Sequence, residues 1–379
     1  MTSSRQHPPD YTLIAVVFVI LIFGLIMLSS ASSVVAYQKF NDSNYLLKHQ
    51  LFYGVSLGLL AMFITSRIAY QTWKKLAIPM LAITILALFI VLVSDAGLTS
   101  GGARRWIDFG FFTFQPSELT KLTFVIYLAT WLSKKGKVIS NFAYGFVPFL
   151  VLLGVITFLV MMQPDLGTMT VIALVSIAIY FIAGGGIKHI LLIIAGGISL
   201  FALLIKIAPY RAARFSVFLN PELDPQGIGY HVNQALLAIG SGGILGLGLG
   251  RSRQKYNFLP EVTGDSIFAV IAEELGFIIS FGLIILFFLL MIRGFKIARS
   301  APDTFGKLVA AGITCWFTIQ AVVNIGSMVS LLPLTGIPLP LVSYGSSAII
   351  ISLAALGILI NISRYTLTTE PSATRTRRK

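Results

Sequence analysis

Long apolar stretches recur along the whole chain, and they limit what this sequence can fold into more than any other feature. Hydrophobic residues make up 56% of the 379 residues and charged residues only 11%, whereas about a quarter of an average soluble domain is charged. A helix needs roughly 20 apolar residues to cross the apolar core of a bilayer. A water-soluble fold is therefore excluded.

Ten stretches approach or exceed that length. They cover approximately residues 11–31, 46–66, 75–94, 116–133, 144–162, 168–184, 189–208, 266–292, 308–332 and 342–363. Backbone polar groups cannot stay unpaired in lipid, and the stretches lack the alternation of a membrane barrel, so each predicts a helix. The sequence thus predicts an all-α polytopic membrane protein with about ten transmembrane helices. We expect the first to be a retained helix rather than a cleaved signal peptide, because nine more follow.

Lysine and arginine residues gather on one side of the membrane if the N-terminus is placed in the cytoplasm. The clusters are Arg67/Lys74/Lys75, Lys134/Lys135/Lys137, Arg293/Lys296/Arg299/Lys307 and Arg364/Arg375/Arg377/Arg378/Lys379. Because short basic loops remain in the cytoplasm, both termini are predicted to be cytoplasmic. The net charge of +14 is then a result of membrane topology, and it requires no nucleic-acid partner.

Most acidic residues lie where this topology does not require them. Only Asp10, Asp303 and Glu370 fall in the predicted cytoplasmic segments, and the others lie in outer loops or within spans. We therefore predict a polar, carboxylate-bearing surface on the outer side. Because Cys315 is the single cysteine and the histidines are scattered, no Cys/His metal site is expected, and a metal would need carboxylate ligands.

The chain is predicted to form one membrane domain, residues 11–365, with cytoplasmic tails at 1–10 and 366–379. Its longest extramembrane segment, residues 209–265, is a large outer loop between the seventh and eighth spans. Within that loop, Val232 to Ile239 is compatible with a helix. The glycines from Gly240 to Gly250 predict close backbone packing, since they lack the Gly-Lys-Ser/Thr ending of a nucleotide-binding loop.

Basic and aromatic residues precede the fourth span. Arg104 and Arg105 suit a phosphate or a lipid headgroup, and Trp106 suits the membrane interface, although interfacial anchoring alone would explain all three. Glu118 and Lys121 are three residues apart on one face of the predicted helix. They form either an ion pair that stabilises the helix bundle or an anion-facing lysine held by its glutamate.

Further acidic residues mark the outer ends of later spans. Asp165, in the turn between the fifth and sixth spans, either caps a helix or contacts a substrate. Asp265 follows Glu261 at the outer mouth of the eighth span, and Glu273 and Glu274 lie two turns deeper. Carboxylates in an apolar helix are costly unless a cationic group pairs with them. We expect Glu273 and Glu274, which point to different sides, to make polar contacts between helices.

An apolar outer segment with three prolines, residues 331–347, precedes and enters the last span. A rigid, uncharged segment of this kind suits the wall of a lipid-facing groove. The alternative is a plain connection between two helices.

In this order, the motifs resemble those of the SEDS family of bacterial cell-wall proteins, which includes FtsW, RodA and their sporulation relatives. The resemblance covers essentially the whole chain and rests on Gly102–Ile107, Gln115–Glu118, Gln163–Gly167, Phe258–Glu261, Ile267–Ala269, Glu273–Gly276 and Pro338–Gly345. Two runs depart from it: Gly264-Asp265-Ser266, where the family usually has Thr-Asp-Phe, and Tyr344-Gly345-Ser346-Ser347, where it has Tyr-Gly-Gly-Ser-Ser. Pro333, Gly336 and the run Leu353 to Arg364 look closer to FtsW than to RodA.

The resemblance implies a peptidoglycan glycosyltransferase in the bacterial cytoplasmic membrane that polymerises lipid II at the outer face, with septal wall synthesis in cell division as the expected role. It implies that Asp265 is the catalytic carboxylate and a candidate ligand of a Mg²⁺ or Mn²⁺ ion, and that the reaction needs no nucleotide. The substrate-binding candidates are Arg104, Arg105, Trp106, Glu118, Lys121, Asp165 and Glu261.

The same resemblance implies partners. These are lipid II, a class B penicillin-binding protein that acts as a monofunctional transpeptidase, and other division or elongation membrane proteins. Three alternatives stay open at this point: a lipid II flippase, an elongation-type polymerase similar to RodA, and a non-catalytic scaffold.

Overall fold

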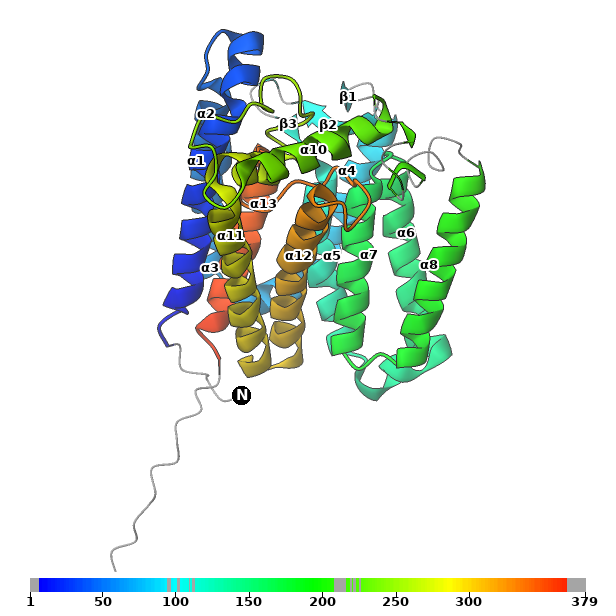
Figure 1. Ribbon diagram of the computed structural model, residues 1–379. Coiled ribbons are helices and arrows are strands. Elements are labelled where there is room, and N and C mark those ends of the chain that lie inside the picture. The colour runs from blue at the N-terminus through cyan, green and yellow to red at the C-terminus, as the bar shows by residue number, and fades with distance from the viewer. Residues whose placement is uncertain are drawn as a thin grey trace, which may run out of the picture.

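The computed structural model of the chain describes residues 7–93, 97–100, 103–108, 110, 113–207, 216–218, 220, 223–224 and 226–366. Most of both predicted tails lies outside these residues. The described part is predominantly helical, and a small sheet lies at one end of the helix bundle (Figure 1).

Helices make up most of the described chain. In the first half of the chain they are α1 (Tyr11–Phe40), α2 (Tyr45–His49), the π-helix η1 (Gln50–Val55), α3 (Ser56–Arg67), α4 (Tyr70–Val93), α5 (Pro116–Ser133), η2 (Gly136–Ser140), η3 (Phe142–Phe146) and α6 (Val147–Met161). In the second half they are α7 (Leu166–Ile182), α8 (Ile187–Ile207), α10 (Ile228–Gly242), α11 (Ile267–Ser300), α12 (Thr304–Met328) and α13 (Ser346–Ser363).

Each of the ten predicted spans contains a helix of the described chain, so the predicted all-α polytopic fold is confirmed. Seven helical segments among the described residues are long and apolar enough to cross a membrane. They are Tyr11–Phe40, Tyr45–Arg67, Tyr70–Val93, Phe142–Met161, Ile267–Ser300, Thr304–Met328 and Ser346–Ser363. Leu166–Ile182 and Ile187–Ser199 are shorter apolar helices, and α5, with its charged residues, completes the set.

Side chains at the helix ends explain where several helices begin. The carboxylates of Asp10, Asp165 and Asp303 each accept a hydrogen bond from a backbone N–H three residues further on, at 2.6–3.0 Å. These caps satisfy N–H groups that have no partner within the helix. Pro116 occupies the first turn of α5, where its missing N–H costs nothing.

α12 and α13 form the centre of the bundle and are largely buried, whereas outer helices such as α4 expose apolar side chains. α3 packs closely on α13 at Gly357. A Cβ at that position would collide with the backbone of Met62 and the side chain of Thr65. At that crossing the Thr65 hydroxyl donates to the carbonyl of Ala354 at 3.0 Å. Small residues allow such close approach between membrane helices.

The two ends of the bundle differ. α1 begins and α13 ends at one end, where the His7 N–H donates to the Arg364 carbonyl at 3.0 Å, so the start of α1 and the end of α13 lie on one side as predicted. At the opposite end α10 lies across the tops of the helices, beside the small sheet (Figure 1). Residues 232–239, which the sequence showed to be compatible with a helix, lie within the longer helix α10.

The small sheet was not expected from the sequence, which predicted a loop before the fourth span. β1 (Gly97–Ser100), β2 (Ala103–Asp108) and β3 (Thr113–Phe114) form an antiparallel sheet in the order β1-β2-β3. The strands are too short, and their polar and glycine content too high, to give a clear alternating pattern. β3 leads directly into α5 and therefore fixes the start of that helix.

α11 also differs from the continuous helix that was expected, because it breaks at Gly276, whose φ is 73°. The segment that follows α10 supplies the missing backbone partners. Leu247 and Gly248 donate N–H groups to the carbonyls of Glu273 and Glu274 at 3.0 and 2.9 Å. A Cβ on Gly246 would collide with the Glu274 carbonyl, which confirms the predicted role of the glycine run in close packing.

Candidate functional site

Asp265 lies directly before α11, at the same end of the bundle as α10, and neighbouring elements hold its backbone. The amide of Asn324, on α12, donates to the carbonyls of Asp265 and Ile337, both at 2.8 Å. Gly336 lies beside the carboxylate, since a Cβ placed on it would be 3.9 Å from Asp265 Oδ2. One buried amide thus joins the Asp265 segment to the 331–347 segment.

Two further hydrogen bonds hold these segments together. The Ser343 hydroxyl donates to the Gly264 carbonyl at 2.6 Å, and the Tyr344 N–H donates to the Thr263 carbonyl at 2.8 Å. The 331–347 segment, the wall segment, therefore packs beside Asp265 and is more than a connection between helices. Whether it borders a lipid-facing groove stays a prediction.

The surroundings of the Asp265 carboxylate favour its protonated form. Only 8% of the residue is exposed. Burial, followed by repulsion from the Glu261 carboxylate, raises the pKa of Asp265 to about 7. Glu261 itself is exposed. A carboxylate with such a pKa can take up or release a proton at neutral pH.

Glu118 and Lys121 form the predicted ion pair, with the Lys121 ammonium 2.8 Å from Glu118 and both side chains 3% exposed. The ammonium also donates to the Gln320 side-chain oxygen at 2.9 Å and lies over the Trp316 ring. The Gln320 amide then donates to the Pro338 carbonyl at 2.8 Å. In this arrangement Lys121 supports the wall segment from within the bundle.

The arginine and aspartate motifs meet at the turn before α7. Arg105, on β2, donates from Nε to the Gln163 carbonyl at 3.1 Å and from Nη2 to the Pro164 carbonyl. Asp165 caps α7 through the Thr168 N–H at 3.0 Å, so the capping alternative is present. The Asp165 carboxylate also lies 3.4 Å from both Gln115 Nε2 and Ser117 Oγ.

The remaining predicted residues of this group lie on β2. Trp106 is half-buried and pairs with Leu98 of β1. Arg104 belongs to the same strand, but its side chain is outside the described part of the chain. Whether these side chains bind a substrate stays a prediction.

The predicted motifs converge on the 331–347 segment. A Cβ on Gly167 would collide with the Thr335 carbonyl, so the turn before α7 packs against this segment. Gln320 links Lys121 to Pro338, and Gly336 lies beside Asp265. Motifs far apart in the sequence therefore lie around one end of the bundle.

Three polar residues that bind the motifs at this end of the bundle were not predicted. Gln320 and Asn324 lie one turn apart on α12, and buried polar side chains in a membrane helix are the signal that could have found them. His231, on α10, has Nε2 2.6 Å from the Ser266 hydroxyl, which in turn donates to the Pro260 carbonyl at 2.7 Å. Only the unusual Ser266 hinted at this contact.

A cavity of about 690 Å³ lies between α1, α2 and the segment before Asp265. Apolar side chains of both helices line it, together with Ser29, Ser30, Ser33 and Lys255. Asp265 is not among its lining residues. The cavity therefore adjoins the 243–266 segment from the side of α1.

These features define a polytopic helical membrane protein with a buried carboxylate of raised pKa at the end of the bundle away from the start of α1. The chain belongs to the cell cycle protein family of FtsW, RodA and SpoVE, whose model matches residues 11–368.

Individual relatives cover nearly the whole chain. Stage V sporulation protein E of Bacillus subtilis (strain 168) is 42% identical over 363 residues, which are 96% of this chain and 99% of that protein. A protein named probable peptidoglycan glycosyltransferase FtsW, of Trichlorobacter lovleyi, is 41% identical over 357 residues, 93% of each chain.

Solved structures are similar as well. A chain of the structure described as "Structural coordination of polymerization and crosslinking by a peptidoglycan synthase complex" has a TM-score of 0.78 and 29% identity, covering 94% of this chain and 98% of that chain. Rod shape determining protein RodA of Thermus thermophilus has a TM-score of 0.67 and 30% identity, covering 95% and 98%.

Proposed function

We propose that this chain is a peptidoglycan glycosyltransferase that polymerises lipid II at the outer face of the bacterial cytoplasmic membrane. Its relatives named FtsW and its similarity to a chain of a peptidoglycan synthase complex support the activity. The observation that carries the proposal is the buried Asp265 carboxylate, with its pKa raised to about 7, at the end of the bundle where the predicted motifs meet.

In the proposed reaction Asp265 acts as the general base. Its carboxylate accepts the proton of the acceptor sugar's 4-hydroxyl, and that oxygen forms a bond to the anomeric carbon of the donor sugar. The bond between that carbon and the pyrophosphate oxygen breaks with inversion, and the lipid pyrophosphate leaves with the electron pair. A base with a pKa near the working pH is efficient, and such a group contributes roughly 10²–10⁴-fold in rate.

Basic side chains would bind the pyrophosphate. Arg104 is the foremost candidate, because a guanidinium matches phosphate oxygens in geometry. Arg105 and Lys121 are already hydrogen-bonded to protein oxygens, so we propose that they mainly hold the site in shape, with Glu118 orienting Lys121. Asp165 contributes by fixing the turn before α7.

We propose that Asp265, with the Glu261 carboxylate near enough to raise its pKa, binds a divalent cation such as Mg²⁺ or Mn²⁺. Mg²⁺ commonly uses one or two carboxylates together with substrate phosphate oxygens, and the mutual repulsion of these two carboxylates would fall when a cation binds. No group of three or more His, Cys, Asp or Glu occurs among the described residues. When bound, the cation would offset negative charge on the leaving pyrophosphate.

We propose a class B penicillin-binding protein as the partner and septal wall synthesis as the role. The relatives named FtsW, at about 40% identity, favour division over elongation. The similarity to a chain of a synthase complex supports a transpeptidase partner. Other division membrane proteins are expected to bind as well.

A lipid II flippase is the second candidate, because the break in α11 is a feature that transporters use near their substrate sites. Polymerisation remains favoured, since the charged groups at the break are already paired within the protein.

The test is lipid II polymerisation by the purified full chain, with and without the partner transpeptidase and with Mg²⁺ or a chelator. We expect glycan chains from the wild type and none from Asp265→Ala or Asp265→Asn. The wild-type rate should rise with pH as the Asp265 carboxylate loses its proton, at about pH 7 without a bound cation and at lower pH with one. Asp42→Asn, at an exposed carboxylate paired with Lys48, is the matched control and should behave like the wild type. Wild-type glycan from both Asp265 variants would refute the assignment, whereas movement of lipid II across vesicles without polymerisation would favour the flippase.

A further inference from the structure

Three charged side chains are buried around the break in α11, and the proposed reaction does not use them. Glu273 and Glu274 lie in α11 just before Gly276, and Lys255 lies in the segment between α10 and α11. The side chains of Lys255 and Glu274 are 3% and 0% exposed, and Glu273 is 1% exposed. Buried charges of this kind persist in membrane proteins when they serve a function.

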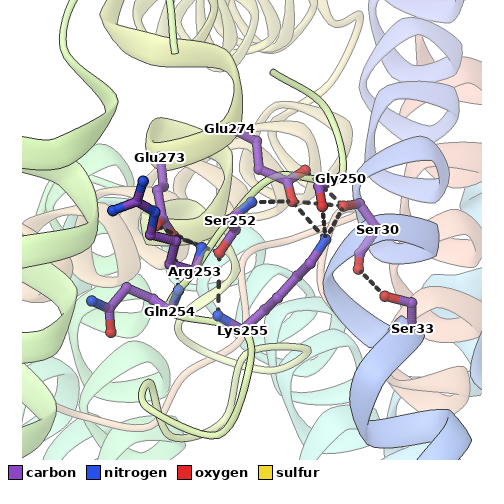
Figure 2. Close-up of polar contacts among 9 residues, drawn as sticks. All are labelled: Ser30, Ser33, Gly250, Ser252, Arg253, Gln254, Lys255, Glu273 and Glu274. Atoms are coloured by element: carbon purple, nitrogen blue, oxygen red, sulfur yellow. Dashed lines mark hydrogen bonds and ion pairs between the residues drawn. The ribbon is translucent and has the colours of Figure 1, made fainter. Parts of the chain in front are cut away.

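Lys255 joins three parts of the chain. Its ammonium lies 2.9 Å from the Glu274 carboxylate, 3.1 Å from the Ser30 hydroxyl on α1 and 2.8 Å from the Gly250 carbonyl (Figure 2). An ammonium has three N–H donors, so all of them are used within the protein. Lys255 therefore has no donor left for a substrate in this arrangement.

The two glutamates hold the same short turn of the chain. Glu274 accepts the Ser252 N–H at 3.2 Å, and Glu273 accepts the Ser252 hydroxyl at 2.5 Å and the Arg253 N–H at 2.9 Å (Figure 2). The Glu274 carboxylate also accepts the Ser30 hydroxyl at 2.7 Å. Charge-assisted hydrogen bonds of this type are stronger than neutral ones.

The held turn belongs to the segment that carries Asp265. The first residues of this segment, 243–266, hydrogen-bond to backbone groups of α11 at its break, and Asp265 follows Lys255 by ten residues. At its far end the segment is bonded to α12 and the 331–347 wall. The contacts of Lys255 thus fix the near end of the segment relative to α1 and α11.

We propose that Lys255 is a positioning residue: its ammonium, shared by Glu274 of α11 and Ser30 of α1, holds the 243–266 segment so that Asp265 stays aligned for glycosyl transfer. This inference rests on the proposed function of Asp265. It predicts that Lys255 affects the catalytic rate without contacting the substrate.

If the pair of Lys255 and Glu274 only stabilised the fold, replacing both residues together would leave the catalytic rate unchanged. Replacing a buried ion pair with neutral residues of similar volume is often harmless to stability, whereas removing one partner leaves an uncompensated charge. The double variant Lys255→Met with Glu274→Gln therefore removes the charges without leaving one unpaired. Lys255→Arg keeps the positive charge, and Lys48→Met, which breaks the exposed pair with Asp42, is the matched control.

Polymerisation of lipid II by the full chain gives the first readout. We expect kcat of the double variant to fall roughly 10- to 100-fold, the cost of small misplacement of a catalytic group, with KM changed less than about twofold. The single variant Lys255→Arg should retain most of the wild-type kcat, and Lys48→Met should match the wild type.

A distance measurement gives a second readout that does not depend on activity. Cysteines introduced at Asn257, in the held segment, and at Leu331, which is 75% exposed, carry spin labels, because the single native cysteine, Cys315, is buried. Double electron–electron resonance spectroscopy should give a narrow distribution of the distance between the two spin labels in the wild-type background and in Lys255→Arg. It should be broad in the double variant.

The two readouts together decide the inference. A narrow distribution in the double variant, or a broad one with wild-type kcat, would overturn the positioning role. A loss of rate through KM alone would also overturn it, since it would mean that Lys255 contributes to substrate binding. If the wild type makes no glycan, the proposed function fails, while the distance distributions still show whether Lys255 holds the segment.

Discussion

Replacing Asp265 with asparagine should stabilise the protein above neutral pH while it abolishes the proposed activity. The folded-state pKa of Asp265 is about 7, against an ordinary value of 3.8. A pKa difference of one corresponds to about 1.4 kcal/mol, so ionised Asp265 costs the folded protein about 4 kcal/mol. Because the folded state holds this proton more tightly than the unfolded chain, stability falls as pH rises from about 4 to about 7. Asparagine, which is nearly the same size and never ionises, removes that loss.

The assay is the midpoint of thermal unfolding of the purified protein at pH 5, 6, 7 and 8, with a chelator present so that no divalent cation binds the carboxylates. The variant should be more stable than the wild type at pH 8, and the difference should fall to less than half of that value at pH 5. Asp42→Asn is the control: Asp42 is exposed, and its hydrogen bond to Lys48 lowers its pKa, so no such trend is expected in this pH range.

Parallel pH profiles of the wild type and Asp265→Asn would refute the reasoning, because they would mean that burial does not disfavour the ionised carboxylate. A variant that is less stable than the wild type at pH 8 would refute it as well.

Three further changes test the packing around the site. Gly276→Ala should strongly destabilise the protein in thermal unfolding, because φ at Gly276 is 73° and the new Cβ would collide with the Gly246 backbone; a wild-type unfolding midpoint would contradict the observed break in α11. Asn324→Leu leaves two carbonyl groups beside the site without their amide donor and should cost about 1–3 kcal/mol for each group left unsatisfied, measured by chemical unfolding; an unchanged stability would be inconsistent with these bonds. Lys121→Met should cost about 3–5 kcal/mol, because it leaves the Glu118 carboxylate buried without its cation, and combining it with Glu118→Gln should restore much of the loss; equal losses in the single and double variants would exclude the pairing.

The helices could be predicted from the sequence because lipid imposes a simple rule on the backbone. Each apolar stretch must satisfy its own hydrogen bonds, so its length and composition suffice to place a helix. The ion pair of Glu118 and Lys121 was equally readable, because residues three apart share a helical face. Asp165 illustrates the limit of such reasoning: its spacing allowed both a cap and a substrate contact, and only the geometry identified the cap.

The contacts between distant segments could not be predicted in the same way. Asn324 meets Asp265 across 59 positions of sequence, and Lys255 meets Ser30 across 225. Such contacts depend on which helices are neighbours, and hydrophobic patterns along a chain do not specify this. The break in α11 was missed for a related reason: Gly276 reads as an ordinary small residue in a membrane helix unless the segment that replaces its hydrogen-bond partners is known.

The charge cluster at the break in α11 also has a consequence for the biogenesis of the protein. A chain is synthesised from its N-terminus, so Ser30 and Lys255 emerge before Glu273 and Glu274. Insertion of a helix that carries two carboxylates into a bilayer is energetically costly. Here the two groups that bind the Glu274 carboxylate, the Ser30 hydroxyl and the Lys255 ammonium, are already synthesised when α11 leaves the ribosome. Stable insertion of α11 should therefore depend on the presence of α1. Truncation of α1 should leave α11 accessible to water-soluble labelling reagents, even though the sequence of α11 is unchanged.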